Sequence, residues 1–324
     1  MKITMIGPVY PYKTGLSYYV GLLYKQLIKN HDVTLYSYSM QYPKLLYKKP
    51  QKDYEDDVVK VDEARFILNS ANPFSWVSLA KKINKDNPDL VILQWLHPYF
   101  APCYSVLERL LNKNIKIAYN CHNALPHERF PFDKALTKFT LKKADLVIAH
   151  SYSDEKTLSE LNMGNKIAVN PHPAYNFFKI KDMTKEEGRK LLNLSTENKV
   201  LLFFGLVREY KGLKHLLNAM PDIAKKYPEV RLIIAGDFGN GRDKYNEMIE
   251  NLKIGDFIQI HDGHIPIPDV EKFFAACDLV VLPYESATQS GVIQAAYGFA
   301  KPVLATNVGG LPDAVSNIKT GHIV

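Results

Sequence analysis

The sequence contains little cysteine and no long apolar run. Its three cysteines, Cys103, Cys121 and Cys277, are far apart and form no C-x-x-C pair. This pattern argues against a disulfide framework or a cysteine-rich zinc site, and it fits a reducing compartment. No apolar stretch approaches the ~18–20 residues needed to span a bilayer, and the N-terminus lacks the apolar core of a secretion signal. We therefore expect a cytoplasmic protein.

Glycine and proline are also scarce, with 17 and 19 residues among 324, so collagen-like and low-complexity chains are excluded. Hydrophobic residues make up 46% and charged residues 23% of the chain, as in folded proteins. At ~150 residues per domain, the length predicts two domains.

The positive charge is confined to one half of the chain. Residues 1–174 carry 23 Lys and Arg against 16 Asp and Glu, which accounts for the whole net charge of +7. Such asymmetry predicts contact with an anionic surface, and the alternative is a solvated basic face without a partner. Because no basic stretch is interleaved with aromatic residues and no nucleic-acid motif occurs, an anionic membrane is favoured over nucleic acid.

Short apolar, β-branched runs alternate with amphipathic stretches along the whole chain. The expected strands are 2–6, 33–38, 90–94, 115–120, 146–149, 166–169, 200–204, 231–235, 258–261, 279–282 and 303–305. The expected helices are 17–29, 75–84, 101–111, 133–143, 154–161, 213–226, 243–252, 269–276, 290–298 and 311–315. This alternation predicts α/β architecture with parallel sheets covered on both faces, in two doubly wound, Rossmann-like domains.

The domain boundary is expected at 170–184, where prolines and aromatics occur without periodicity. We assign residues 1–174 to the first domain and residues 175–324 to the second. The last residues, 321–324, resemble the start of another strand. Since a domain of this type continues with further helices, we expect the natural protein to be longer by one or two helices.

Ligands of open α/β sheets bind beyond the carboxyl ends of the strands, so the loops there are the candidate sites. In the first half, the loop 7–16 contains Gly7 and Gly15, which allow close approach of a phosphate to a helix N-terminus. The loop after strand 115–120 carries a group of polar residues: His122, Asn123, His127 and Glu128. For both loops the alternative is a purely structural turn.

In the second half, strand 200–204 ends at Gly205 and is followed by Arg208 and Lys211. Two cations before a helix can bind a pyrophosphate and stabilise it as a leaving group. The loop after strand 279–282 leads into a helix whose N-terminal amides favour an anion, beginning with Gln289, Ser290, Gly291 and Val292. The alternatives are a solvated basic turn and simple N-capping.

These features predict a diphosphate site in a cleft between the domains. No acidic pair stands at a strand end, and no HExxH, GxSxG or P-loop motif occurs. We therefore expect neither a bound metal nor a cofactor.

At these positions the sequence resembles glycosyltransferase family 4, the retaining enzymes of the GT-B fold. The resemblance runs through nearly the whole chain, and its segments occur in the family's order: the early glycine loop, the HN loop, GLVREYKG, LIIAG, HDGHIP, AACDLVVLPY and KPVLATNVGGLPD. It implies transfer of a sugar from a UDP- or GDP-linked donor to an envelope, polysaccharide or lipid-linked acceptor, with retention and without an obligatory metal.

The resemblance also implies that residues 1–174 form the acceptor-side domain and residues 175–324 the donor-binding domain, and it implies roles for individual residues. Gly15 approaches the donor phosphate, His122 meets the donor sugar, and Arg208 and Lys211 bind the diphosphate. Three further residues, Gly263, His264 and Ile265, line the base pocket, mainly through their backbone.

The chain departs from the family pattern in three places. Leu206 stands where an arginine is usual, and Thr14 replaces one glycine of the first loop. The segment that usually carries two glutamates reads ATQSGVIQA, from Ala287 to Ala295. Glu285 is close enough to replace the first glutamate, whereas nothing obvious replaces the second.

Two further interpretations remain open on the sequence alone. The missing glutamates also fit a catalytically silent homologue that binds a nucleotide sugar or a partner enzyme. A GT-B epimerase or a nucleic-acid-binding protein is the remaining alternative.

Overall fold

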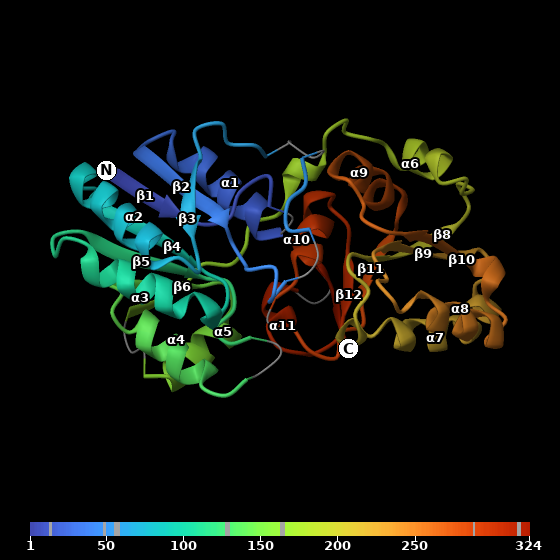
Figure 1. Cartoon of the computed structure of the whole chain (residues 1–324). Coiled ribbons are helices and arrows are strands. Elements are labelled where there is room, and N and C mark those ends of the chain that lie inside the picture. Colours follow the sequence, from blue (N-terminus) through green and yellow to red (C-terminus); the bar gives the residue numbers. More distant parts are fainter. Residues whose placement is uncertain are drawn as a thin grey trace. The chain divides into compact units, whose positions relative to one another are not determined.

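The chain consists of two compact units, Met1–Asn170 and Pro171–Val324 (Figure 1). The computed structural model describes residues 1–12, 15–47, 50–54, 59–126, 130–162, 166–287, 289–315 and 319–324. The division falls at the start of the connector that the sequence predicts. No helix within these described ranges is both long and apolar enough to cross a membrane.

The first unit is built on a seven-stranded parallel sheet with the order β3-β2-β1-β4-β5-β6-β7. Its strands are β1 (Lys2–Ile6), β2 (Asp32–Met40), β3 (Arg65–Asn69), β4 (Leu90–Trp95), β5 (Lys116–Cys121), β6 (Leu146–Ala149) and β7 (Ile167–Val169). Its helices are α1 (Gly15–Leu27), α2 (Pro73–Asp86), α3 (Ala101–Leu110), α4 (Asp133–Leu141) and α5 (Tyr152–Glu160), with a 3-10 turn η1 (Pro98–Phe100).

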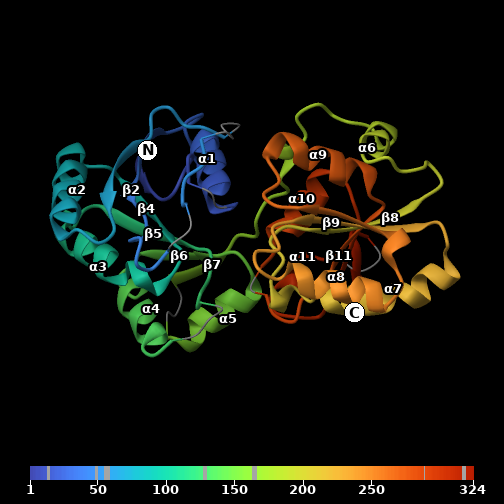
Figure 2. The ribbon, with the colours of Figure 1, turned by 45° about the vertical axis from the view of Figure 1, so that its right-hand side comes forward.

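Helices cover both faces of this sheet. α2, α3 and α4 lie along one side, and α1 lies on the other (Figure 2). Trp76 and Leu79 of α2 pack with Trp95 in the larger core, while Val20 of α1 packs with Met5 in the smaller one. Both faces are therefore apolar, which leaves the strand ends as the place for polar chemistry.

The second unit has a six-stranded parallel sheet with the order β10-β9-β8-β11-β12-β13. Its strands are β8 (Lys199–Phe204), β9 (Val230–Gly236), β10 (Ile258–Asp262), β11 (Leu279–Leu282), β12 (Val303–Ala305) and β13 (Gly321–Ile323). Its helices are α6 (Lys185–Leu191), α7 (Leu213–Lys226), α8 (Arg242–Asn251), α9 (Ile267–Ala276), α10 (Gly291–Gly298) and α11 (Leu311–Ala314), with 3-10 turns η3 (Asn176–Phe178), η4 (Glu209–Lys211) and η5 (Gly255–Phe257).

This second sheet is also covered on both faces. α9 and α10 lie on one side, and α7 and α8 lie on the other (Figure 2). Phe274 and Ile293 belong to the core under α9 and α10, and Leu217 and Ile249 belong to the core under α7 and α8.

In each sheet, the order in which the chain adds strands changes direction once. The change lies between β1 and β4 in the first unit and between β8 and β11 in the second. The expectation of two doubly wound α/β units with parallel sheets is confirmed. In such sheets a ligand binds outside the carboxyl ends of the strands at the reversal. The loops after β8 and β11 flank that point in the second unit, and the loops after β1 and β4 flank it in the first.

The sequence patterns missed two elements. β3 is an edge strand in which only Leu68 is fully buried, so it lacks the alternation that marks a strand. In α6 the buried residues are Gly188 and Arg189, which gives no apolar periodicity. A Cβ on Gly188 would lie 2.9 Å from the backbone of Lys272 and Ala276, so α6 packs against α9 at closer range than other residues allow.

The segment before α6 is held in place by one buried carboxylate. Glu271 of α9 is completely buried, and it accepts hydrogen bonds from the backbone N–H groups of Ile180, Lys181 and Met183 at 2.8–3.0 Å. A carboxylate with several N–H donors satisfies groups that would otherwise be left unpaired away from water. Glu271 therefore attaches the irregular segment to α9.

We predict that Glu271→Ala lowers the free energy of unfolding by about 2–4 kcal/mol, because three backbone donors lose their acceptor. Glu250→Ala, on the exposed side of α8, serves as the matched control and should change stability by less than about 0.5 kcal/mol. Urea unfolding followed by circular dichroism measures both variants. Equal stability of the two would show that Glu271 does not hold the segment.

Candidate functional site

Three adjacent strands of the second unit end in glycines with left-handed backbone. Gly205, Gly236 and Gly263 follow or close β8, β9 and β10, with φ values of +98°, +148° and +116°. A Cβ on Gly236 would lie 2.0 Å from the carbonyl oxygen of Gly205, so only glycine fits there. The Gly263 N–H donates to the Gly236 carbonyl at 3.3 Å. Gly236 therefore allows the backbones at the ends of β8 and β9 to approach each other closely.

Lys211 places its ammonium group over the first of these glycines. A Cβ on Gly205 would lie 3.2 Å from Lys211 Nζ and 3.7 Å from a methyl group of Val292. The ammonium also lies 5.3 Å from the centre of the Tyr284 ring, a cation–π contact. Lys211 thus joins the β8 loop to the β11 loop at the reversal of strand order.

The carboxylates of the β8 and β11 loops, Glu209 and Glu285, are paired with other side chains. Glu209 binds Lys214 at 3.3 Å and Lys244 at 2.9 Å, and Glu285 binds Lys214 and the His215 Nε2 at 2.8 Å each. The hydrogen bond from Lys214, and to a smaller extent that from His215, lowers the pKa of Glu285 below its usual value. Within the described part of the chain, no carboxylate is recorded as an ion-pair partner of Lys211, which leaves its charge available to an anion.

Glu285 consequently lies against α7, where Lys214 and His215 hold its carboxylate. Its backbone N–H donates to the Tyr210 carbonyl at 2.7 Å, which ties the β11 loop to the Lys211 turn. These contacts position the turn. A role of Glu285 at the donor sugar stays a prediction from the sequence.

The N-terminus of α10 lies beside Lys211. Ser290 is the N-cap, its hydroxyl accepts from the Val292 N–H at 3.3 Å, and it lies 3.4 Å from the Tyr284 hydroxyl. Gly291 is exposed, and Gln289 is partly buried beside it. The positive end of a helix dipole next to an ammonium group favours a phosphate.

Arg208 is directed elsewhere. Its Nη1 donates to the Val207 carbonyl at 2.9 Å and to the Asp237 carbonyl at 3.5 Å. A Cβ on Gly239 would lie 3.5 Å from the same nitrogen. The guanidinium therefore lies against the loop after β9.

The expected base-pocket residues follow β10. His264 is exposed, while Ile265 is partly buried and packs on the core under α9. They stand at the carboxyl end of the strand next to β9.

In the first unit, the expected sugar-binding histidine lies at the end of β5 and is tied to β4. His122 is buried, with 4% of its surface exposed, and its Nε2 lies 2.8 Å from Gln94 Oε1. Because an amide oxygen only accepts, Nε2 carries the proton in this arrangement. A Cβ on Gly7 would lie 2.4 Å from the Gln94 side chain, so Gly7 gives Gln94 the space to reach His122.

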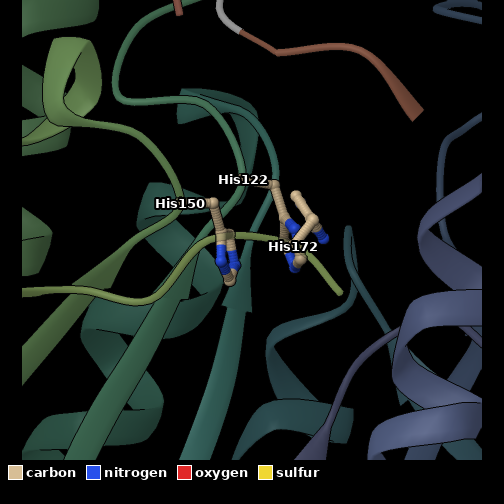
Figure 3. A group of neighbouring side chains, drawn as sticks. All are labelled: His122, His150 and His172. Carbon is tan, nitrogen blue, oxygen red and sulfur yellow. The ribbon is translucent and has the colours of Figure 1, made fainter. Parts of the chain in front are cut away.

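A second imidazole lies beside His122. The rings of His122 and His150 lie side by side (Figure 3), with their centres 5.0 Å apart. The Tyr19 ring lies edge-on to both, at 5.0 and 5.3 Å. His150 Nδ1 lies 2.7 Å from the Asn170 carbonyl. Burial lowers the pKa of His150, so its ring is neutral near pH 7. Figure 3 also draws His172, which belongs to the second unit.

The remaining expected residues of the first unit are less informative. Gly15 begins α1, and apart from its chain neighbours and its own helix, no described residue has an atom within 4 Å of the position of a Cβ there. Asn123 is partly buried next to His122. His127 and Glu128 fall outside the described residues, as does Thr14.

Three residues of these two sites escaped the sequence analysis. Gln94 carries the only polar side chain of the run LVILQW, which was a usable signal near the end of a buried strand. Tyr284 immediately follows Pro283 after β11, but only the structure shows that its ring faces Lys211. Lys214 belongs to the periodic pattern of α7, so its ion pairs with two loops could not be expected.

Comparison with known proteins agrees with these features. Residues 13–174 match the family model described as Glycosyltransferase Family 4, and residues 184–324 match the model described as Glycosyl transferases group 1. The D-inositol 3-phosphate glycosyltransferase of Segniliparus rotundus is 29% identical over 187 residues, which are 56% of this chain and 41% of that protein. The matched part thus spans less than half of that relative. N-acetyl-alpha-D-glucosaminyl L-malate synthase of Bacillus anthracis is 25% identical over 258 residues, 76% of this chain and 63% of that protein.

Solved structures share the fold at low sequence identity. Sucrose-phosphate synthase from Thermosynechococcus elongatus superposes with a TM-score of 0.76 at 18% identity, over 99% of this chain and 85% of that one. The Anabaena protein HepE in complex with UDP superposes with a TM-score of 0.73 at 17% identity, over 100% and 85%. Both family models and both superpositions agree with the two parallel-sheet units described above. The chain therefore belongs to glycosyltransferase family 4, and its two α/β domains have the GT-B fold.

Proposed function

We propose that the protein is a retaining, metal-independent glycosyltransferase that uses a nucleoside-diphosphate sugar. The observation that carries the proposal is the position of the Lys211 ammonium. It lies over Gly205, beside the N-terminus of α10, and both neighbouring carboxylates are paired with other cations. A diphosphate supplies the anion that such a site lacks.

Transfer breaks the bond between the anomeric carbon and the oxygen of the diphosphate, so negative charge develops on that oxygen. A fixed ammonium group and the amides of a helix N-terminus stabilise this charge without reorganisation. We propose that Lys211 binds one phosphate group of the diphosphate and that the Ser290–Gly291 turn binds the other. Arg208 joins them only if its guanidinium leaves the Asp237 carbonyl.

The roles of the first unit are proposals by family membership. His122 would contact the donor sugar, with Gln94 orienting its ring from β4. Gly15 would approach the donor phosphate at the start of α1, and Asn123 would lie on the acceptor side. We also propose His127 and Glu128 for the acceptor side.

The choice of substrates follows from the relatives' printed names. HepE was crystallised with UDP and with UDP-glucose, which supports a UDP-linked donor, while a GDP-linked donor remains the alternative. The names of two relatives indicate small acceptors, inositol 3-phosphate and malate. For this chain we propose, from the family resemblance, a glycan or lipid-linked acceptor of the cell envelope. The three free, buried cysteines support a cytoplasmic location.

We predict that Lys211→Ala lowers turnover by about 10²–10³-fold, because one charge-assisted contact in the transition state is lost. Lys225→Ala, on the exposed end of α7, is the control and should retain full activity. Both variants should unfold at the wild-type temperature in a thermal-shift assay. Wild-type turnover by the Lys211 variant would overturn the diphosphate assignment.

Activity should survive excess EDTA, since Lys211 and the α10 N-terminus supply the positive charge that a divalent ion would otherwise bring. The measurement is the initial rate of donor consumption before and after chelation, followed by addition of Mn²⁺. A rate that falls to background with EDTA and returns with Mn²⁺ would contradict metal independence.

The anomeric configuration of the donor should be kept in the product. Proton NMR of the reaction, started with an α-linked donor, should show an α-anomeric signal in the product or in the sugar released by hydrolysis. A β-linked first product would contradict the retaining mechanism. Binding of donor without transfer or hydrolysis would instead support the silent homologue.

A further inference from the structure

The first unit has a basic pocket at its sheet edge, away from the candidate sugar-transfer residues. The pocket has a volume of about 410 Å³ and is lined by Tyr36, Arg65, Ile67, Lys82, Lys85 and Asp86. Such a volume is within the ~300–1,000 Å³ of small-molecule sites. α2 runs back from the end of β3 to the start of β4, so its last turn lies toward the amino ends of the strands. Gly7 and His122 follow the carboxyl ends.

The charge in this pocket is strongly positive. Arg65, Lys82 and Lys85 are exposed at its wall, and no ion pair is recorded for them among the residues that the structure describes. The one carboxylate of the lining, Asp86, is neutralised by Lys2 at 2.7 Å. Three cations around a concave surface form a site for a group with more than one negative charge or several acceptor oxygens.

The pocket also has a defined aromatic wall. The Arg65 guanidinium lies 5.8 Å from the centre of the Tyr36 ring, and Tyr36 itself is buried. The contact with a fixed ring restrains the guanidinium. It therefore loses less conformational entropy when it binds two oxygens of an anionic group. Arg65 and Tyr36 pair across β3 and β2, which fixes both at the sheet edge.

The outer face of α2 continues this surface with apolar groups. Phe74 is 84% exposed and Val77 37% exposed. Together with Lys81 and Lys85 they recur at the spacing of one helical face. The opposite face, with Leu79 and Ile83, is buried. A helix face that combines exposed aromatic and aliphatic groups with lysines has the composition of a surface that lies on an anionic bilayer.

We propose that this pocket binds the phosphate of an anionic lipid headgroup while Phe74 and Val77 rest in the bilayer interface. The first unit then docks on the membrane through α2 and the β3 edge. Arg65, Lys82 and Lys85 supply part of the excess positive charge of residues 1–174. The proposal concerns attachment alone and holds whether or not the proposed sugar transfer is correct.

The test is co-sedimentation of the whole protein with vesicles of phosphatidylcholine, with and without phosphatidylglycerol. The wild type should bind only the anionic vesicles, and the binding should fall as salt rises. The double variant Lys82→Gln/Lys85→Gln should partition about 30-fold more weakly, from the contribution of each lysine near an anionic surface. The matched control is Lys225→Gln/Lys226→Gln, which removes the same charge from the exposed end of α7 in the second unit.

Three outcomes would overturn the proposal. One is an equal loss of binding in the two double variants, which would indicate general charge attraction. Another is equal binding of the wild type to neutral and anionic vesicles, or to neither. The last is stabilisation by free glycerol phosphate that requires Lys82 and Lys85, without any vesicle binding, which would indicate a soluble phosphate ligand. Phe74→Ser should weaken vesicle binding and leave any response to glycerol phosphate unchanged.

Discussion

Burial of both faces of a parallel sheet is the constraint on which the other features of this protein depend. In each unit the strands are apolar on both sides because helices cover both sides. Polar groups can then reach a ligand only from the strand ends, where the backbone turns into a loop. Gly205, Gly236 and Gly263 lie at such ends, as does His122, and each is held by hydrogen bonds or close backbone contacts to a neighbouring strand.

The second unit shows how the charge of one lysine is kept available. The loops around Lys211 contain Glu209 and Glu285, either of which could have paired with it. Lys214 and Lys244 bind the first, and Lys214 and His215 bind the second. These surface pairs contribute little to stability. Their effect is on position, since they join η4, α7 and the β11 loop, and they direct the carboxylates away from the Lys211 ammonium.

The first unit separates buried polar groups from exposed cations. At the carboxyl ends of its strands, the polar side chains of Gln94, His122 and His150 are buried. At the opposite end, Arg65 and the lysines of α2 are exposed around a pocket whose single carboxylate is already paired. The exposed cations around this pocket therefore lie toward the amino ends of the strands, away from Gln94 and His122.

By itself, the sequence determined the order and type of nearly all the elements, because apolar periodicity reports directly which face of a segment is buried. It also determined which loops follow the strands, and so identified Gly205, Lys211, Ser290 and His122 as candidates before any distance was known. Only the tertiary structure decided the partners of these residues. The periodic pattern of α7 does not show that Lys214 binds carboxylates of two loops. The residues next to Lys211 in the sequence do not show that the Arg208 side chain donates to the Asp237 carbonyl. β3 and α6 escaped the sequence for a related reason. An edge strand with one buried residue and a helix that packs through a glycine and an arginine carry no apolar pattern, and contacts from distant segments stabilise them.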